Sequence, residues 1–406
     1  MLTTDANKAV NVIRKLGGRP LLVGGCVRDH ILGIKSKDID IEVHGPVTPV
    51  QVQNALLEVG RVDAVGMSFG VLKFGRDVDI SFPRRDSRTG DGHTGFTIQV
   101  DPTMTIEEAL SRRDFTINSM AMDTATGEVI DPFGGLADLR EGLIRHTSDA
   151  FSDDPLRVLR AVQFSARLNM SIADETLTLC RELAPRLVEL SKERIWVEWE
   201  KILTKGISMD RVGDAIDQIG LLGMFPGWER ESTWFTDEML GENRDLKGER
   251  RERMILGTQF LSRPEVLDDF LRLIDAPIWL RRDAKLLASR ATRTDWAGVS
   301  CASQARQLSR QFKSVTLRDR LIVKQAQGCD VWLSAEAQGI LDAPLKPLLT
   351  GEHLKDLGMT PGPVFGKILK EALEVQDREG WTTETEALAW FQARLNHWSS
   401  WEDWAS

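Results

Sequence analysis

The sequence lacks long apolar runs and is poor in cysteine. Its 406 residues contain no stretch near ~20 uninterrupted apolar residues, so a transmembrane helix is excluded. The N-terminal residues are polar and periodic, and we expect no secretory signal. The cysteines occur singly, without CxxC spacing, at Cys26, Cys180, Cys301 and Cys329. This scatter argues against a disulfide framework or a cysteine zinc site, and it predicts a protein of the reducing cytoplasm with no membrane partner.

The aromatic content excludes disorder as the main state. The chain has 15 Phe and 12 Trp, with 42% hydrophobic and 28% charged residues, which is the composition of a globular protein. Its length predicts roughly two to four domains. The net charge of −9 argues only weakly against a nucleic-acid partner, because binding follows local patches of charge.

One local patch is strongly basic. Residues 280–325 carry eleven Lys and Arg side chains but only three Asp. The segment is either a solvated helical face or a surface that contacts a nucleic-acid backbone. In the second case its affinity for nucleic acid would fall steeply with salt.

Residue patterning divides the chain into a mixed head and a helical remainder. Apolar or strictly alternating runs predict strands at 19–25, 38–43, 70–74 and 77–82. Helical spacing occurs at 5–16, at 27–33 and from 105 to 123, while the polar, glycine-rich segment 84–96 predicts a loop. After about residue 150 strand patterns nearly vanish and amphipathic helices follow one another. This layout indicates an α+β protein with a long helical arm.

Gly24 and Gly25 lie between a predicted strand and a predicted helix. Glycine allows a ligand to approach the backbone closely, and a helix N-terminus favours an anion. Arg28, in the first turns of the helix, could reach a triphosphate. A plain turn is the competing interpretation, since a glycine pair before a helix is usually no more than that.

Asp38 and Asp40 are two residues apart in a predicted strand and therefore project from one face. Adjacent carboxylates repel each other unless a cation lies between them, and such oxygen ligands suit Mg²⁺ with a bound nucleotide. Asp79 offers a third carboxylate on a later strand, with Asp77 as a competing candidate. An edge strand with a solvated acidic face would produce the same pattern.

The order of these motifs resembles that of the DNA polymerase β-like nucleotidyltransferases. The segment RRDFTINSMA at 112–121 further resembles the RRDFTINAMA motif of the class II tRNA nucleotidyltransferases and bacterial poly(A) polymerases. Other family motifs are matched in order by GHTGF at 92–96, DPFGG at 131–135, DDPLRVLR at 153–160, SKERIW at 191–196 and a tail segment at 350–369. The resemblance covers residues 20–205 and this tail segment.

The resemblance implies a role for each matching residue. Asp38 and Asp40 are expected to bind two Mg²⁺ ions, with Asp79 as the third catalytic carboxylate. The implied nucleotide-binding residues are Gly24, Gly25, Arg28, Arg113, Asp114, Asn118, Asp154, Arg157, Arg160 and Arg194. Within this set Gly25 and Arg28 would hold the triphosphate, and Asp114 and Asn118 would help to recognise the ribose.

Asp154 and Arg157 are expected to act as an amino-acid template for the incoming base, with Arg160 beside them and Arg194 bracing their helix. An arginine fork and a carboxylate offer donors and an acceptor to a base edge. Cytosine and adenine both present an exocyclic amine and a ring nitrogen acceptor, so one pair can accept both. Read alone, Asp154 before Pro155 would be a helix N-cap, and the arginines would be surface salt-bridge residues.

Two features depart from the family pattern. Gln163 stands where many members have another arginine, so one nucleotide contact is expected to be missing. Many bacterial relatives also carry an HD phosphohydrolase domain, which needs histidine ligands for its metal. None of the six histidines of this chain lies between residues 147 and 352. We therefore expect no such activity.

The resemblance implies an enzyme that adds C, C and A to the tRNA 3′ end, using CTP and ATP without a nucleic-acid template. A partial enzyme that adds only CC or only A, or a poly(A) polymerase, is the alternative. The expected organisation is a catalytic head with a mixed sheet of roughly five strands at 1–145, a helical neck at 146–210, and an RNA-binding helical body and tail at 211–406. The loop 84–96 is expected to move when specificity switches from CTP to ATP.

Overall fold

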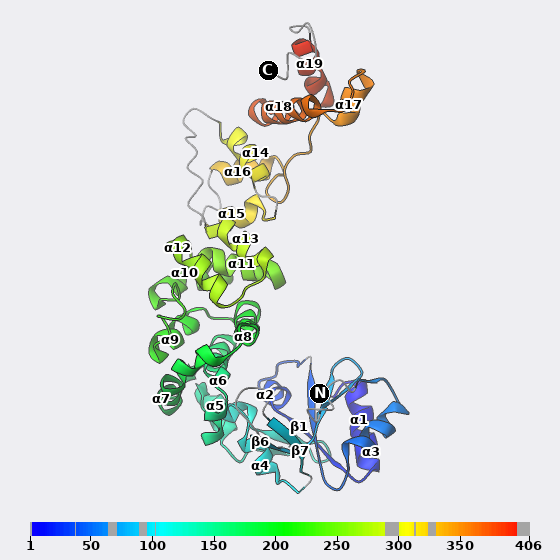
Figure 1. Ribbon diagram of the computed structural model, residues 1–406, viewed down its shortest axis with the longest axis vertical. Helices are drawn as coiled ribbons and strands as arrows, with labels where there is room; N and C mark the ends of the chain where they lie inside the picture. The colour runs from blue at the N-terminus through cyan, green and yellow to red at the C-terminus, as the bar shows by residue number, and fades with distance from the viewer. Residues whose placement is uncertain are drawn as a thin grey trace. The chain divides into compact units, whose positions relative to one another are not determined.

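A computed structural model describes the chain in eight ranges, 2–36, 38–63, 71–88, 96–101, 103–288, 300–311, 314–323 and 330–395. The contacts divide the chain into two units, Met1–Met224 and Phe225–Ser406. Figure 1 shows the strands in the first unit and helices throughout the second. Within these eight ranges, no helix is both long enough and apolar enough to cross a membrane.

A sheet of seven strands forms the centre of the head, in the order β3-β4-β5-β2-β1-β8-β9. The strands are β1 Arg19–Val23, β2 Ile39–His44, β3 Val62–Asp63, β4 Val71–Phe74, β5 Val78–Ser81, β8 Ala121–Asp123 and β9 Val129–Ile130. β2 and β5 are parallel and the other pairs antiparallel, so the predicted mixed sheet is confirmed. The predicted number of strands was too low because β3 and β9, with two residues each, are too short to show an alternating pattern.

Alternation fixes which face of β2 is buried. Ile39, Ile41 and Val43 are buried in the core, so Asp40 projects from the opposite face. β1 is buried on both faces, and its Leu21 and Val23 pack with Leu110 and Ala121. The helices α1 Thr4–Lys15 and α3 Pro49–Leu57 lie side by side against the head (Figure 1).

Two predicted segments of the head differ from the structure. The helix expected over 105–123 ends early, giving α4 Ile106–Ser111, a 3₁₀ turn at Thr116–Asn118 and then β8. The Asp114 side chain accepts hydrogen bonds from the Phe115 amide and from Asn118, and such local bonds compete with a helix. The predicted loop 84–96 contains strands at both ends, since β6 Arg84–Arg88 pairs with β7 Phe96–Val100. Gly90, Gly92 and the rest of 89–95 lie outside the described residues.

Helices complete the first unit. They are α2 Gly25–Ile31, α5 Gly135–Glu141, α6 Leu156–Leu168, α7 Asp174–Leu183, α8 Lys192–Lys205 and α9 Asp210–Ile219, with 3₁₀ turns at Asp149–Asp153 and Ala184–Glu189 and a short parallel pair of β10 Leu143–Ile144 and β11 Ser171–Ile172. α6 packs against α8 and α9, burying Val158, Val162 and Trp199. Pro185 ends the α-helical part of 174–190, because proline lacks the amide that the next turn requires.

Every regular element that the structure describes in the second unit is a helix. Its helices are α10 Arg230–Glu242, α11 Gly248–Gln259, α12 Pro264–Leu273, α13 Ile278–Ala288, α14 Cys301–Gln311, α15 Leu317–Val323, α16 Asp330–Ala337, α17 Gly351–Asp356, α18 Pro363–Glu379 and α19 Glu384–Leu395. An aromatic group of Phe225, Trp228, Phe260 and Phe270 packs within α10–α13 and the segment before them. A separate core joins α17, α18 and α19 around Leu354, Ile368 and Phe391.

Candidate active site

Gly24 forms the turn between β1 and α2. Its φ of +72° lies in the region that glycine favours. A Cβ at this position would lie 2.5 Å from Nη1 of Arg113 and 3.8 Å from the carbonyl oxygen of Asn118. The backbone conformation therefore favours glycine, and the absence of a side chain lets the Arg113 guanidinium approach the turn closely. The predicted phosphate-binding turn lies directly against a cation from the 112–121 motif.

The strand register places two of the three predicted carboxylates opposite each other. Asp40 of β2 is the direct partner of Asp79 in the parallel strand β5, and the exposed Asp38 lies just before β2. Burial raises the pKa of the Asp40 carboxyl, and repulsion from Asp79 and Asp38 raises it further, with the charge of Arg113 as a partial offset. The ionised form of Asp40 is thus destabilised until a cation is added.

Lys73 is a member of this cluster that sequence reasoning missed. Its Nζ lies 3.0 Å and 3.2 Å from the two carboxylate oxygens of Asp79, because the two residues are partners across β4 and β5. In the sequence, only the alternating pattern of residues 70–74 indicated that Lys73 lies on a strand. The cluster therefore carries three carboxylates and a nearby ammonium group.

The donor chemistry of the cluster fits a divalent cation. Hard carboxylate oxygens suit Mg²⁺, and the mutual repulsion at Asp40 would be relieved by one. Within the described ranges, however, no three His, Cys, Asp or Glu side chains lie close enough together to enclose a metal ion. Asp79 is instead paired with Lys73, whereas no such ion pair holds the two predicted ligands Asp38 and Asp40 among the described residues.

Glu42 and His44 extend the polar face of β2. His44 Nε2 lies 2.8 Å from Glu42 Oε1, and both residues are buried. Burial alone would raise the pKa of Glu42, but its hydrogen bond to His44 and the charge of Arg113 lower it. The charge of Arg113 therefore acts on both Asp40 and Glu42, and it offsets this acidic face together with Lys73 and Arg84.

Arg28, which the resemblance assigns to the triphosphate, is buried in the head. It is 1% exposed, and its Nε and Nη2 donate to Asp29 Oδ1 at 2.9 Å and 2.6 Å. Its Nη1 donates to Asn118 Oδ1 at 2.5 Å, while the guanidinium lies 5.2 Å from the centre of the Phe164 ring. In this state its side chain links α2 to the 112–121 motif.

Asp114 joins that motif to α6. Its Oδ1 accepts from Asn118 at 3.0 Å, and its Oδ2 accepts from Arg160 at 2.7 Å. Burial alone would raise the pKa of Asp114, but Arg160 and Asn118 lower it. Arg160 Nη1 also approaches Glu198 Oε1 of α8 at 3.8 Å. The structure thus brings four predicted residues, Arg28, Asn118, Asp114 and Arg160, into one buried polar chain.

Asp154 and Arg157 lie together at the start of α6. Asp154 Oδ1 accepts from the Leu156 amide at 3.1 Å, as an N-cap does, and its Oδ2 lies 2.8 Å from Arg194 Nη2. Arg157 donates to the carbonyl oxygens of Ala150 and Arg112 at 2.7 Å and 2.8 Å, and burial lowers its pKa. Arg157 therefore anchors α6 to the segment that carries Arg113.

Gln163, where many members of the resembled family have an arginine, is buried on α6 between Arg160 and Phe164. No described residue accepts a hydrogen bond from its Nε2.

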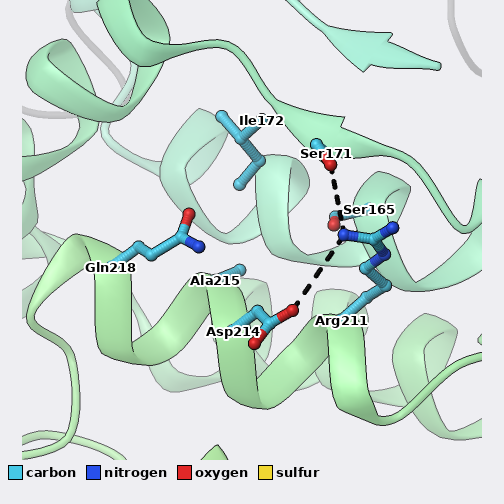
Figure 2. Close-up of a pocket in the computed structure, with 7 residues that line it drawn as sticks. All are labelled: Ser165, Ser171, Ile172, Arg211, Asp214, Ala215 and Gln218. Atoms are coloured by element: carbon cyan, nitrogen blue, oxygen red, sulfur yellow. Dashed lines mark hydrogen bonds and ion pairs between the residues drawn. The ribbon is translucent and has the colours of Figure 1, made fainter.

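Figure 2 shows a small pocket where the Arg211 guanidinium lies between Asp214 and Ser171. Its lining residues come from α6, β11 and α9, and none of them is among the predicted site residues. The candidate site is defined by its polar contacts rather than by this pocket.

The basic segment 280–325 uses its described cations internally. Seven of them lie in described ranges, and each contacts an acidic side chain or a backbone carbonyl: Arg281, Arg282, Lys285, Arg306, Arg310, Arg318 and Arg320. Arg306 and Arg320 are buried. Arg290, Arg293, Lys313 and Lys324 lie outside the described residues. An RNA contact in the described part of this segment would therefore depend on exposed cations such as Arg282.

Comparison with known families agrees with this arrangement. Residues 21–145 match the family model of the poly A polymerase head domain, and residues 169–226 match the model of a probable RNA and SrmB-binding site of polymerase A. A Vibrio parahaemolyticus protein described as a multifunctional CCA protein is 46% identical over 189 residues, which cover 45% of this chain and 45% of that protein. The matched part is thus less than half the length of this relative.

Solved structures share the fold over nearly the whole chain. The Bacillus stearothermophilus CCA-adding enzyme in complex with CTP is 24% identical, with a TM-score of 0.69 and 97% of each chain covered. The Thermotoga maritima CCA-adding enzyme complexed with tRNA is 23% identical, with a TM-score of 0.64 and 97% of this chain and 96% of that chain covered.

The mixed-sheet head and the helical arm share the fold of these solved enzymes. The part of the chain that matches the poly A polymerase head domain, residues 21–145, also carries the Gly24 turn and the paired Asp40 and Asp79 of the candidate site.

Proposed function

We propose that this chain adds C, C and A to the 3′ end of tRNA, using CTP and ATP and releasing pyrophosphate. The observation that carries the proposal is the pairing of Asp40 with Asp79 in the sheet that also carries the Gly24 turn. The 46% identical relative supports it by its description as a CCA protein. One of the solved neighbours is in complex with CTP and another with tRNA, and both support the proposal.

Base selection is assigned to the N-terminal end of α6. The Asp154 carboxylate can accept a hydrogen bond from the exocyclic amine that cytosine and adenine share, and Arg157 can donate to their ring nitrogen. The bond from Arg194 to Asp154 and the two backbone carbonyls that hold Arg157 fix both groups before a base arrives. Fixed groups lose little conformational entropy on binding, which favours selectivity.

Asp38 and Asp40 are the proposed ligands of two Mg²⁺ ions, with Asp79 completing the site. When bound, the ions would stabilise the charge that develops on the α-phosphate and activate the RNA 3′-hydroxyl. The residues of the chain supply the surrounding charges. Arg113 lies between the acidic face and the Gly24 turn, where it can contact the nucleotide.

The tRNA is expected to contact residues 169–226 among others, because that segment matches an RNA-binding family model.

We also propose a cytoplasmic location. Cys26, Cys180 and Cys301, the cysteines within the described ranges, are free thiols, as a reducing compartment predicts.

A nucleotide-incorporation assay tests the proposal. Three tRNA transcripts, ending at the discriminator base, at C and at CC, are incubated with Mg²⁺ and with CTP, ATP or both. We expect each transcript to be extended to a finished CCA end and no further. The matched control is Asp77→Asn, since Asp77 is exposed just before β5, as Asp38 is just before β2. We expect Asp77→Asn to remain active, which would also exclude Asp77 as the third carboxylate, and Asp38→Asn to be inactive.

Other outcomes would replace the proposal with a defined alternative. Extension that stops at CC, or that begins only from CC, would identify a partial enzyme. Open-ended addition of A would identify a poly(A) polymerase. No incorporation into any transcript by folded protein would contradict the tRNA assignment.

A further inference from the structure

One face of α6 carries a row of cationic and aromatic side chains. Arg157, Arg160, Phe164 and Arg167 are spaced by three, four and three residues, so they lie along one side of the helix. From Arg157 to Arg167 the helix rises about 15 Å. That span is comparable to the length of an extended nucleoside triphosphate. The row begins at the proposed base-recognition pair and ends near the acidic face of the head.

Arg167 is the arginine of this row to which no role has yet been assigned. Its Nη2 lies 3.6 Å from Asp29 Oδ2, and burial and the neighbouring charge of Arg28 lower its pKa, with Asp29 and Asp38 as partial offsets. Two guanidinium groups thus share the single carboxylate of Asp29. Such a group of charges has a surplus positive charge, which an added anion would balance.

The two arginines differ in their access to a ligand. Arg28 is 1% exposed, and its donors already serve Asp29 and Asn118. The Arg167 side chain is 31% exposed, and its contact with Asp29 is long for a hydrogen bond. Of this pair, Arg167 is therefore the cation that can take an anionic oxygen without disrupting the buried polar chain.

We infer that Arg167 binds the phosphate chain of the incoming nucleotide, while the N-terminal end of the same helix selects the base. The inference rests on the proposed function, and it names a binding residue that the motif comparison did not supply. A single rigid helix would then fix the distance between the base-recognition pair and the phosphate-binding guanidinium. The helix would then contact both the phosphate chain and the base edge of the nucleotide.

Equilibrium binding by calorimetry tests this assignment on the full chain. The probes are CTP, inorganic pyrophosphate and cytidine, titrated into the wild type, Arg167→Gln and Arg140→Gln. Arg140 is an exposed arginine in the last turn of α5, so it controls for the loss of one positive charge. We expect Arg167→Gln to weaken the binding of CTP and pyrophosphate about tenfold or more, to leave cytidine unchanged, and to differ from Arg140→Gln in this respect.

A second variant separates phosphate binding from a purely structural role. Arg167→Lys keeps the charge and should recover part of the pyrophosphate affinity, and it stays informative if Arg167→Gln does not fold. Unchanged affinity for CTP and pyrophosphate in folded Arg167→Gln would overturn the inference, as would an equal loss for cytidine. Failure of the wild type to bind CTP at all would instead count against the proposed function.

Discussion

At the scale of single residues, the site contains charges that the fold alone does not favour. The Asp40 carboxyl is partly buried opposite Asp79, and its pKa is raised by burial and by the two neighbouring carboxylates. A group whose pKa is higher in the folded than in the unfolded state reduces stability once it is ionised. Such a cost is typical of residues kept for function.

We predict that Asp40→Asn abolishes nucleotide incorporation and yet stabilises the protein. The variant removes an unfavourable charge, so the free energy of unfolding should rise by about 0.5–2 kcal/mol near neutral pH. Because Asp40 has a raised pKa, this gain should shrink as the pH falls and the wild-type carboxyl becomes protonated. Thermal unfolding of both proteins between about pH 7 and pH 4 measures the difference. A variant that is less stable than the wild type at neutral pH would contradict the prediction.

The ion pair of Arg194 with Asp154 leads to a second prediction. Both side chains are about one third exposed, so Arg194→Met should cost at most about 1 kcal/mol of stability. Asp154 would keep its cap of the Leu156 amide but would lose the partner of its second oxygen. We expect a higher KM for CTP and ATP and more frequent incorporation of UTP. Steady-state kinetics with each nucleotide test this, and Arg378→Met, in an exposed pair with Glu379 on α18, serves as the control.

At the scale of elements, α6 joins the helical region to the head through an aromatic side chain. The Phe164 ring has the guanidinium of Arg28 at 5.2 Å and that of Arg160 at 5.4 Å from its centre. It also meets Phe115 edge to face at 5.6 Å. One side chain thus organises cations from α2 and α6 around the buried polar chain.

Replacing Phe164 by leucine should keep most of the apolar packing and remove both cation–π contacts. We expect a loss of about 1.5–3.5 kcal/mol in the free energy of unfolding, from two cation–π contacts of about 0.5–1 kcal/mol each and the edge-to-face pair with Phe115, which contributes about 0.5–1.5 kcal/mol. Urea unfolding measures this loss. Phe133→Leu, a partly buried ring of the head core with no cation–π contact recorded in the described ranges, provides the comparison. Equal losses in the two variants would exclude a special role for the cations.

The sequence supported the prediction of elements with strong periodicity. β2 was predictable because Ile39, Ile41 and Val43 alternate with polar residues, and α6 because its apolar face recurs at helical spacing. The helix expected over 105–123 failed because Asp114 binds its neighbours locally and because β8 pairs with β1. Pairing with a strand about 100 residues away leaves no local pattern.

The candidate site was predictable where motifs are contiguous, and unpredictable where partners come from different elements. The resemblance supplied Asp38, Asp40 and Asp154 directly. Lys73 was missed because only the register of β4 against β5 brings it to Asp79. Arg167 was missed because its neighbour Asp29 is far away in sequence. The buried position of Arg28 could not be foreseen, since its partner Asn118 is 90 residues away.

At the scale of the whole molecule, buried charges also stabilise the second unit. Asp377 of α18 is 4% exposed, and its Oδ2 lies 2.5 Å from Arg310 Nε of α14. Arg306 of α14 donates to the Asp377 carbonyl oxygen at 2.7 Å. These contacts join the α14–α16 region to the α17–α19 region through two arginines of the basic segment.

We predict that Arg310→Met destabilises the protein by about 3–5 kcal/mol, because it leaves the Asp377 carboxylate buried without its cation. Calorimetric unfolding measures the change. Lys370→Met, which breaks an exposed pair with Glu374 on α18, should cost less than about 1 kcal/mol. If Arg310→Met instead lowered tRNA affinity with no loss of stability, Arg310 would be an RNA contact. Its assignment to a stabilising ion pair with Asp377 would then be wrong.

The pairing of Asp40 with Asp79 depends on β2 keeping its register with β5, where Ile39 lies opposite Val78 and Ile41 opposite Ile80. Adding or removing one residue within β2 would exchange its two faces, so that isoleucine would replace aspartate at the site and aspartate would enter the core. Natural length variation and engineered insertions should therefore be tolerated in the connections on either side of this strand and rejected within it.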